Sequence, residues 1–429
     1  MSSKLIDLPI LTGYQKMSKL QVAYSYVGAK KASYIRAYHH LKDGLKIKQW
    51  TKVSMFVKAD KHPYENLVSK NPKIPRAIQF RSPEFNLLLA AHLKPYEKLL
   101  YEQLVSDKGF RVVAKGLNNV QRAQNIVEAS AAFQAPTYVL LDHSKFDAHI
   151  NVAHLKWITR QYYRTTRNKF LRYLSSRNIK NHGRTKSGIV YSVEGTRMSG
   201  DFDTALGNTM LNYAVLKWVF RQFNTHMLID GDDSVVIMER RDYATVKKFQ
   251  FECDCIEMGF KTKIQVVHNI QEVEFCQSKL IVADPPRFAR NPRRALSNYT
   301  VTLKDYEGDS RLRYLAGVGQ GEMAASAGVP ILQAFALANA RCHSKPMFIE
   351  ELAVAYGPPG SPLDIDDDVR QQFDVQWGIS PQDQLHLESK ILTPTRVAAS
   401  HLLAFYSDLL PRYYNEFFNP QDGEVTAEG

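Results

Sequence analysis

Apolar residues recur at helical spacing in three parts of the chain. Over residues 84–105 one side of the predicted helix carries Leu88, His92, Tyr96 and Leu99. The same spacing returns over 204–220, and the strongly basic segment 151–180 is also typical of helix. These patterns predict three helical regions in the first half of the molecule.

Short apolar runs predict strands between these helices. They cover residues 53–59, 137–141, 226–229 and 234–238. The last two runs flank Asp-Gly within residues 230–233, and this dipeptide suits the tight turn of a β-hairpin. Helices and a hairpin in one chain predict an α+β fold with a small antiparallel sheet.

The second half of the chain is mostly helical in pattern from residue 287 onward. Residues 323–340 carry no charge, but they contain Ser326, Pro330 and Asn339. We therefore predict a buried helix broken at 328–330, because a membrane span needs roughly 20 mostly apolar residues. The segment from Pro420 to the last residue is expected to be disordered.

Composition places the chain among ordinary globular proteins and excludes a fibrous or disordered one. Of the residues, 44% are hydrophobic and 23% are charged. The length of 429 residues predicts two or three subdomains. The formal charge of +13 and a pI near 9.3 fit a polyanionic partner such as a nucleic acid. A basic surface that only keeps the protein soluble is an equal alternative.

Four cysteines give no disulfide framework, which favours a reducing compartment. Cys253 and Cys255 form a C-x-C pair close to His268. This could be half of a zinc site, but zinc usually takes four ligands, so we favour buried thiols.

Carboxylates occur where the predicted strands end. Asp142 closes one strand, and Asp232 and Asp233 occupy the hairpin turn. If the strand and the hairpin lie side by side, three carboxylates meet and repel one another. Hard oxygen ligands select Mg²⁺ or Mn²⁺. Two such ions about 3.5–4 Å apart can assist an in-line phosphoryl displacement.

The Gly-Asp-Asp triplet of the hairpin turn is by itself a weak signal of function. The order of the acidic residues along the chain makes the signal more specific. Residues 142–147 have a D-x4-D pattern, and residues 198–208, Met-Ser-Gly-Asp-Phe-Asp-Thr-Ala-Leu-Gly-Asn, form a small-residue loop that leads into a helix. With the hairpin they match polymerase motifs A, B and C in order and spacing.

The chain resembles the RNA-dependent RNA polymerases of positive-strand RNA viruses, most closely the tombusvirus-like (carmovirus and umbravirus type) group. Residues 197–208 resemble that group's motif B, and residues 274–278 its motif E. Residues 56–61 and 75–81 resemble the basic motif F, and residues 328–333 resemble a thumb segment.

This resemblance implies roles for individual residues. Asp142, Asp232 and Asp233 would bind magnesium, with manganese as a substitute. Ribose selection is implied for Asp147, Ser199, Gly200, Thr204 and Asn208. Contacts to the triphosphate or RNA are implied for Lys58, Lys61, Lys73, Arg76 and Arg81. Lys263 would donate a proton to the leaving group, with Lys261 as its rival.

The resemblance also implies a right-hand fold with fingers, palm and thumb. Fingers are expected from residues 1–136 and 151–195, palm from 137–150 and 196–285, and thumb and C-terminal region from 286–429. RNA synthesis would start without a primer. The aromatic residues Phe373 and Trp377 are candidates for a stacking platform, although a role in the thumb core is equally compatible with the pattern.

The implied partners are the RNA template and product, nucleoside triphosphates, other viral replication proteins and host factors. Relatives usually carry an N-terminal membrane-targeting segment, which we do not find. We therefore expect a protein of the host cytoplasm that reaches membrane-associated replication complexes through partners.

Two other functions were weighed. A reverse transcriptase shares the acid cluster, but it would lack the loop and helix containing Ser199, Thr204 and Asn208. A non-catalytic RNA-binding or coat protein would explain the basic charge but not three converging carboxylates.

Overall fold

The computed structural model describes residues 4–44, 46–58, 75–246, 248–298, 302, 304–349, 352–353, 356–357 and 360–393. It divides the chain into two compact units. Unit 1 comprises residues 1–116 and 125–276, and unit 2 comprises residues 117–124 and 277–429. The predicted disorder after Pro420 lies outside the described residues.

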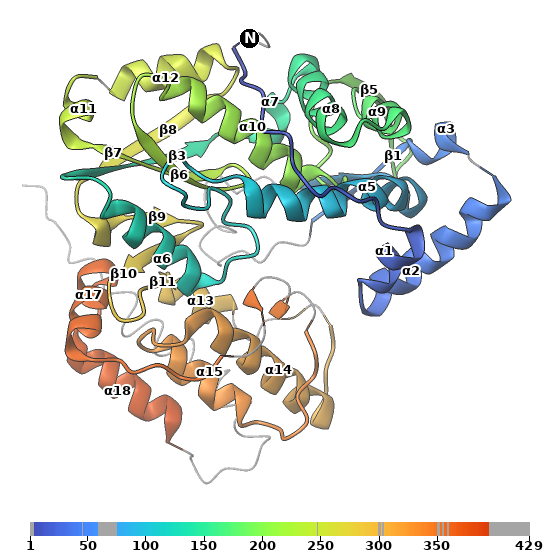
Figure 1. The fold of residues 1–429 in the computed structure, drawn as a ribbon. Helices are drawn as coiled ribbons and strands as arrows, with labels where there is room; N and C mark the ends of the chain where they lie inside the picture. Colours follow the sequence, from blue (N-terminus) through green and yellow to red (C-terminus); the bar gives the residue numbers. More distant parts are fainter. Residues whose placement is uncertain are drawn as a thin grey trace, which may run out of the picture. The chain divides into compact units, whose positions relative to one another are not determined.

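Unit 1 combines helices with two four-stranded sheets (Figure 1). Its helices and 3₁₀ turns are α1 (Lys19–Tyr24), α2 (Gly28–His40), η1 (Leu41–Asp43), α3 (Ile47–Trp50), α5 (Pro83–Gln103), α7 (Phe146–His149), α8 (Val152–Thr166), α9 (Lys169–Ser176), α10 (Thr204–Val219), α11 (Arg240–Ala244), α12 (Lys248–Glu257) and η2 (Ile270–Glu272). Helix α6 (Asn119–Ser130) has its first residues in unit 2 and the rest in unit 1. The predicted helices at 84–105 and 204–220 are confirmed as α5 and α10.

The antiparallel sheet has the strand order β6-β7-β3-β8. Its strands are β3 (Pro136–His143), β6 (Thr225–Asp230), β7 (Asp233–Glu239) and β8 (Thr262–Val267). Strands β6 and β7 form the predicted hairpin, with Asp230 opposite Asp233. Helices α10 and α12 cover one face of the sheet and bury the apolar side chains of β3 and β7 there. The expectation of a small antiparallel sheet in an α+β chain is confirmed.

The mixed sheet has the order β2-β1-β4-β5. Its strands are β1 (Val53–Val57), β2 (Ala77–Phe80), β4 (Lys180–Thr185) and β5 (Val190–Glu194). Strand β1 is antiparallel to β2 and parallel to β4. Strand β1, from the first of the two segments that resemble motif F, therefore pairs with the hairpin of β4 and β5, a long-range contact that sequence spacing does not reveal. The short strand β9 (Glu274–Phe275) completes unit 1.

Unit 2 is mainly helical. Its elements are β10 (Ser278–Ile281), β11 (Arg287–Arg290), α13 (Pro292–Asn298), α14 (Gly308–Ser326), α15 (Leu332–Ala340), α17 (Asp367–Trp377) and α18 (Pro381–Leu392). Strand β10 pairs antiparallel with β11. Helices α14 and α15 approach so closely that a Cβ atom on Gly319 would lie 2.3 Å from the backbone nitrogen of Ala340. The predicted broken helix over 323–340 is confirmed, and among the described residues no helix is long and apolar enough to span a membrane.

Unit 2 also places the aromatic residues that were candidates for a stacking platform. Phe373 is fully buried in the apolar core of the unit. Trp377 is half-buried against that core, with the Nζ atom of Lys279 4.7 Å from its ring centroid. The stacking role considered for Phe373 is therefore wrong for this conformation, because the ring has no exposed face.

Candidate active site

The three predicted carboxylates lie at one end of the antiparallel sheet. Leu141 of β3 lies opposite Ser234 of β7, so the next residues outward, Asp142 and Asp233, occupy the same edge. Asp232 is in the adjoining turn, where Gly231 has the positive φ of 68° that a tight hairpin turn requires. The strand register thus brings together acids that are about ninety positions apart in the sequence.

The surroundings of the cluster disfavour the ionised form of its carboxyl groups. Desolvation raises the pKa of Asp233 to about 6, and repulsion from Asp232, Asp230 and Asp142 adds to this effect. Desolvation also raises the pKa of Asp232, to which Asp147 and Asp142 contribute. Mutual repulsion of this kind is relieved by a bound cation.

The carboxylates do not form a closed metal cage. Within the described ranges, no group of three or more His, Cys, Asp or Glu side chains is arranged to hold a metal ion. An open arrangement is compatible with Mg²⁺, which commonly binds through one or two carboxylates together with waters and substrate phosphates.

Asp147 and Asn208 form the pair predicted to lie beside the ribose. The Asn208 Nδ2 atom donates a hydrogen bond of 2.7 Å to Asp147 Oδ1. Burial raises the pKa of Asp147, while the Asn208 hydrogen bond and Arg197 oppose that shift. The two side chains come from α7 and α10, so a contact across the fold sets their spacing.

The loop before α10 is held by its own backbone and by β2. The Thr204 hydroxyl lies 3.0 Å from the carbonyl oxygens of both Met198 and Asp201, which share its one donated proton. The Gly200 amide donates to the Gln79 carbonyl at 2.7 Å. A Cβ atom on Gly200 would lie 2.6 Å from that of Phe80, so this close approach requires glycine. Ser199 is half-buried in the same loop.

Two buried ion pairs fix the same loop. Arg81 bonds to Asp201 and Asn181, and Arg197 lies 3.0 Å from Asp203. The Arg81 side chain is 1% exposed, and through these contacts its guanidinium links the mixed sheet to the loop. The predicted contact of Arg81 with a triphosphate is therefore corrected to a structural role in this conformation.

The other predicted phosphate contacts fall into two groups. Lys58 and Arg76 are exposed at the paired ends of β1 and β2, where the Lys58 amide donates to the Arg76 carbonyl at 2.8 Å. Lys61 and Lys73 lie outside the described residues.

Lys263 is opposite Asp142 in the register of β8 and β3. Its side chain is exposed and shares the sheet face of Asp142. Lys261 is also exposed, but its backbone carbonyl pairs with Ser144 beyond the end of the strand. The register therefore favours Lys263 over its rival as the group nearer the carboxylates.

A hydrogen-bonded chain behind the turn was not predicted. The Asn212 Nδ2 atom donates to the carbonyls of Gly231 and Asp232 at 3.1 and 3.2 Å. The Asn212 Oδ1 atom must then accept from His143 Nε2, at 3.1 Å, and His143 Nδ1 accepts from the Thr262 hydroxyl at 2.7 Å. Burial lowers the pKa of His143 to about 4, so the ring is neutral at pH 7.

This hydrogen-bonded network connects the turn that carries Asp232 to α10 and β8. The sequence offered one signal: Asn212 lies four residues after Asn208, on the same face of a helix. His143 packs against Phe146 and Phe260, and its two ring nitrogens complete the hydrogen-bonded network.

The C-x-C pair fits the interpretation as thiols. Burial raises the pKa of Cys255 to about 11, which keeps the sulfur protonated and unsuited to metal binding. Cys253 is half-buried on the same helix, α12.

The antiparallel sheet, the acidic residues at its end and the Asp147–Asn208 pair thus occur together in one α+β chain. The family model described as "Viral RNA dependent RNA polymerase" matches residues 7–352, and the chain belongs to this family. The resemblance to tombusvirus-like polymerases is thereby confirmed.

Curated relatives agree with this assignment. The chain is 31% identical to the RNA-directed RNA polymerase of Oat chlorotic stunt virus, covering 89% of this chain and 54% of the relative. It is 29% identical to that of Groundnut rosette virus, covering 92% and 49%. For that of Turnip crinkle virus the identity is 30%, covering 72% and 40%. The chain thus spans about half the length of the curated relatives it matches or less.

Proposed function

We propose that this chain is an RNA-directed RNA polymerase that copies a viral RNA template from nucleoside triphosphates. The observation that carries the proposal is the meeting of Asp142, Asp232 and Asp233 at one sheet edge, with the Asp147–Asn208 pair nearby. Membership of the family and the names of the relatives support it.

The carboxylates would hold two divalent cations, magnesium in preference and manganese as a substitute. When bound, the cations would neutralise charge on the attacking and leaving oxygens of the phosphoryl transfer. The donor set fits, because all three ligands are oxygen ligands, and burial together with repulsion between the carboxylates raises the pKa of Asp232 and of Asp233.

The protein side chains have separate tasks in this proposal. Asp142 and Asp232 would bind both cations and Asp233 would support the second. The hydrogen bonds of Asn212 keep the turn at the sheet edge. Lys263 would give a proton to the pyrophosphate leaving group. Lys58 and Arg76 would attract the triphosphate through their charge.

Incorporation of labelled nucleotides on an RNA template tests the proposal. We expect incorporation that requires both the RNA template and a divalent cation. Incorporation on RNA of deoxynucleotides alone would indicate a reverse transcriptase. RNA binding with no incorporation under any cation would indicate a non-catalytic RNA-binding protein.

Asn208→Ala should relax the choice of sugar. A polar pair beside the ribose distinguishes RNA precursors by hydrogen bonding to the 2′-hydroxyl, and its loss should lower the ribo-to-deoxyribonucleotide ratio about tenfold. The ratio is measured by single-nucleotide incorporation. Asn269→Ala, an exposed asparagine outside α10, is the matched control. An unchanged ratio in Asn208→Ala would refute this role.

We also propose the hand-like division into fingers, palm and thumb, with residues 137–150 and 196–285 as palm, and primer-independent initiation. The support is the family resemblance. On an unprimed template the chain should yield products that begin with a 5′-triphosphate nucleotide, measured with γ-labelled triphosphates. Products that form only after addition of a primer would contradict this.

The remaining proposals concern partners and location. Other viral replication proteins and host factors would recruit the chain to membrane-associated complexes in the host cytoplasm.

A further inference from the structure

We propose that His143 and Asn212 are positioning residues for the cation site of the carboxylate cluster. They fix the spacing of the Asp142 and Asp232 carboxylates, which raises the affinity of the site for Mg²⁺ more than its affinity for Mn²⁺. Neither side chain is a cation ligand, and both act through the backbone that carries the ligands. The proposal rests on the proposed function only for the identity of the two carboxylates as cation ligands.

The Asn212 side chain holds the turn between β6 and β7 from α10. Its Nδ2 atom donates to the carbonyls of Gly231 and Asp232 at 3.1 and 3.2 Å, so one amide holds the peptide units on both sides of the Asp232 Cα atom. The Gly231 amide also donates to the Thr209 hydroxyl at 3.0 Å. Asn212 is fully buried, and Thr209 is 1% exposed. The Asp232 side chain therefore projects from a backbone that α10 fixes.

The His143 ring links this amide to the strand that carries Asp142. His143 follows Asp142 in β3 and is 2% exposed. Its Nε2 atom donates to Asn212 Oδ1 at 3.1 Å. The Phe146 and Phe260 rings, whose centroids lie 5.2 and 5.4 Å from that of the imidazole, keep the ring in this orientation. Two side chains thus connect the end of β3 with the turn.

The other ring nitrogen of His143 fixes the start of β8 at the same level. His143 lies opposite Thr262, and Asp142 lies opposite Lys263 in the register of the two strands. The His143 Nδ1 atom accepts a hydrogen bond from the Thr262 hydroxyl at 2.7 Å. The network therefore reaches the three elements that carry Asp142, Asp232 and Lys263.

All hydrogen bonds of the network run in one direction. The Thr262 hydroxyl donates to the ring, the ring donates to the Asn212 oxygen, and the Asn212 nitrogen donates to the turn. An apolar side chain in place of the imidazole would leave buried polar atoms on both sides without a partner, which is unfavourable. Packing alone does not require this arrangement, because a phenylalanine ring would fill a similar space.

A fixed spacing of carboxylates affects Mg²⁺ more than Mn²⁺. Mg²⁺ is small and requires nearly ideal octahedral coordination by oxygen, whereas the larger Mn²⁺ ion tolerates a more distorted arrangement. Groups that orient metal ligands typically change metal affinity about 10–100-fold when they are removed. Loss of the network should therefore lower the ratio of Mg²⁺ affinity to Mn²⁺ affinity.

Cation binding in the absence of RNA and nucleotides tests the proposal. Binding of Mn²⁺ to the full chain is measured by electron paramagnetic resonance, and the affinity for Mg²⁺ is measured by competition. The measurement does not require RNA synthesis. A chain that binds cations but makes no RNA would refute the proposed function and leave this test intact.

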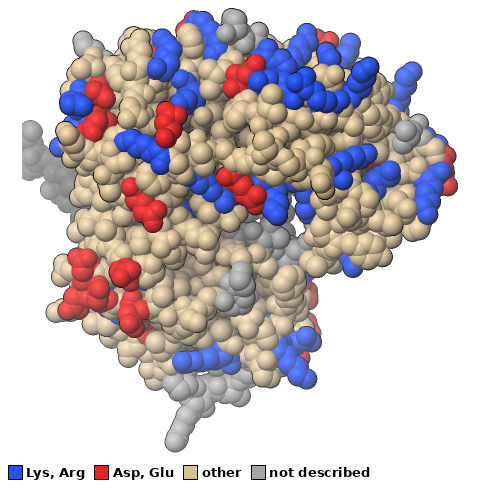
Figure 2. All heavy atoms as spheres, viewed as in Figure 1, with Lys and Arg blue, Asp and Glu red and all other residues tan. Residues whose placement is uncertain are grey.

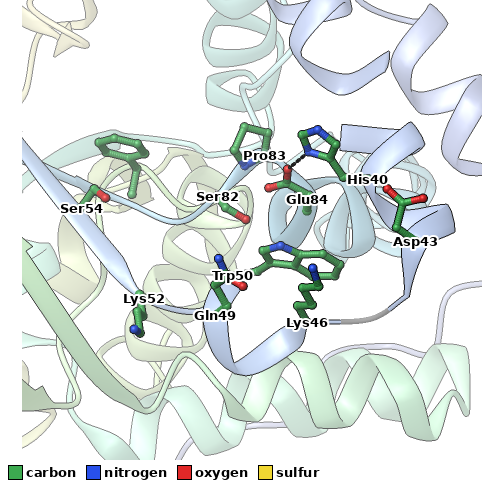
Figure 3. Close-up of a pocket in the computed structure, with 11 residues that line it drawn as sticks. His40, Asp43, Lys46, Gln49, Trp50, Lys52, Ser54, Ser82, Pro83 and Glu84 are labelled. Atoms are coloured by element: carbon green, nitrogen blue, oxygen red, sulfur yellow. Dashed lines mark hydrogen bonds and ion pairs between the residues drawn. The ribbon is translucent and has the colours of Figure 1, made fainter. Parts of the chain in front are cut away.

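Other carboxylates bind Mn²⁺ weakly, and the test has to separate them from the cluster. Figure 2 shows Asp and Glu side chains in several separate groups on the visible face of the molecule. Asp43 and Glu84 also line a cavity of about 550 Å³, where His40 lies 2.8 Å from Glu84 (Figure 3). Asp232→Ala removes a ligand of the cluster and leaves these groups in place, so it defines the background binding.

His143→Phe keeps an aromatic ring against Phe146 and Phe260 but removes both hydrogen bonds of the imidazole. It should weaken Mg²⁺ binding about tenfold and Mn²⁺ binding by a smaller factor. His143→Gln, whose amide can donate to Asn212, should bind Mg²⁺ within about threefold of wild type. His154→Phe is the matched control, because it replaces another buried imidazole that stacks on Phe260. Its affinity ratio should equal that of wild type.

Three results would overturn the proposal. One is a wild-type affinity ratio in His143→Phe, and another is an equal change of the ratio in His154→Phe. The third is Mg²⁺ binding by His143→Gln as weak as that by His143→Phe, which would assign the effect to the shape of the ring. Thermal unfolding confirms that each variant is folded. If His143→Phe does not fold, Asn212→Ser takes its place, because it withdraws the amide from the turn, and the same fall in the ratio is expected.

Discussion

Alanine in place of Asp142 or Asp232 should abolish nucleotide incorporation while leaving RNA binding within about twofold of wild type. The carboxylates would hold the cations, whereas Lys and Arg side chains hold the RNA backbone. Loss of a cation ligand removes several kcal/mol of transition-state stabilisation, so the rate should fall on the order of a thousandfold.

The assay is single-nucleotide extension at saturating Mg²⁺, with RNA affinity measured in parallel by anisotropy. Asp242→Ala is the matched control, because Asp242 belongs to α11 in the same unit and lies outside the cluster. Incorporation at the wild-type rate by purified Asp232→Ala or Asp142→Ala would remove the catalytic assignment. Equal loss of RNA affinity would instead indicate that the sheet edge has lost its structure.

The elements of the acid edge were predictable because their signals are local. Asp-Gly between two apolar runs specifies a β-hairpin. The strand that ends in Asp142 can pair with an edge of this hairpin in only a few registers. Antiparallel register then determines that Asp142 and Asp233 share an edge. The pairing of Asp147 with Asn208 was implied by the family resemblance, and the structure brings the two side chains to 2.7 Å.

Contacts between distant segments were not predictable in the same way. Arg81 looked like an exposed member of a basic segment, because nothing near it in the sequence indicates Asp201 as its partner. Asn212 belongs to none of the motifs, and its role appears only when the hairpin turn is placed against α10. Phe373 carries no local sign that separates a core side chain from a surface one.

The buried ion pairs also explain how a loop rich in small residues keeps one conformation. Gly200 and Gly207 allow close approach, and a Cβ atom on Gly207 would collide with the Arg197 guanidinium. The Arg197 amide in turn donates to the Asp147 carbonyl at 2.9 Å. Arg197 thus joins the loop to the segment that carries Asp147. Its side chain occupies the space that a side chain at Gly207 would need.

Arg197→Met should destabilise unit 1 by about 3–5 kcal/mol, the usual cost of leaving one member of a buried ion pair without its partner. The side chains of Arg197 and Asp203 are 1% and 3% exposed. Burial disfavours the charged guanidinium, but Asp203 and Tyr162 outweigh it and raise the pKa of Arg197. In Arg197→Met the Asp203 carboxylate would keep, among the residues that the structure describes, the hydrogen bond from the Tyr162 hydroxyl at 3.1 Å.

Urea unfolding followed by tryptophan fluorescence measures this loss, with two variants for comparison. Arg160→Ala, which breaks a half-exposed pair with Asp7, should cost no more than about 1 kcal/mol. The double variant Arg197→Met/Asp203→Leu should recover part of the stability, because an apolar pair leaves no uncompensated charge in the interior but the buried Tyr162 hydroxyl loses its acceptor. A double variant as unstable as Arg197→Met would show that the cost comes from packing around Gly207 and from that hydroxyl rather than from the unpaired carboxylate.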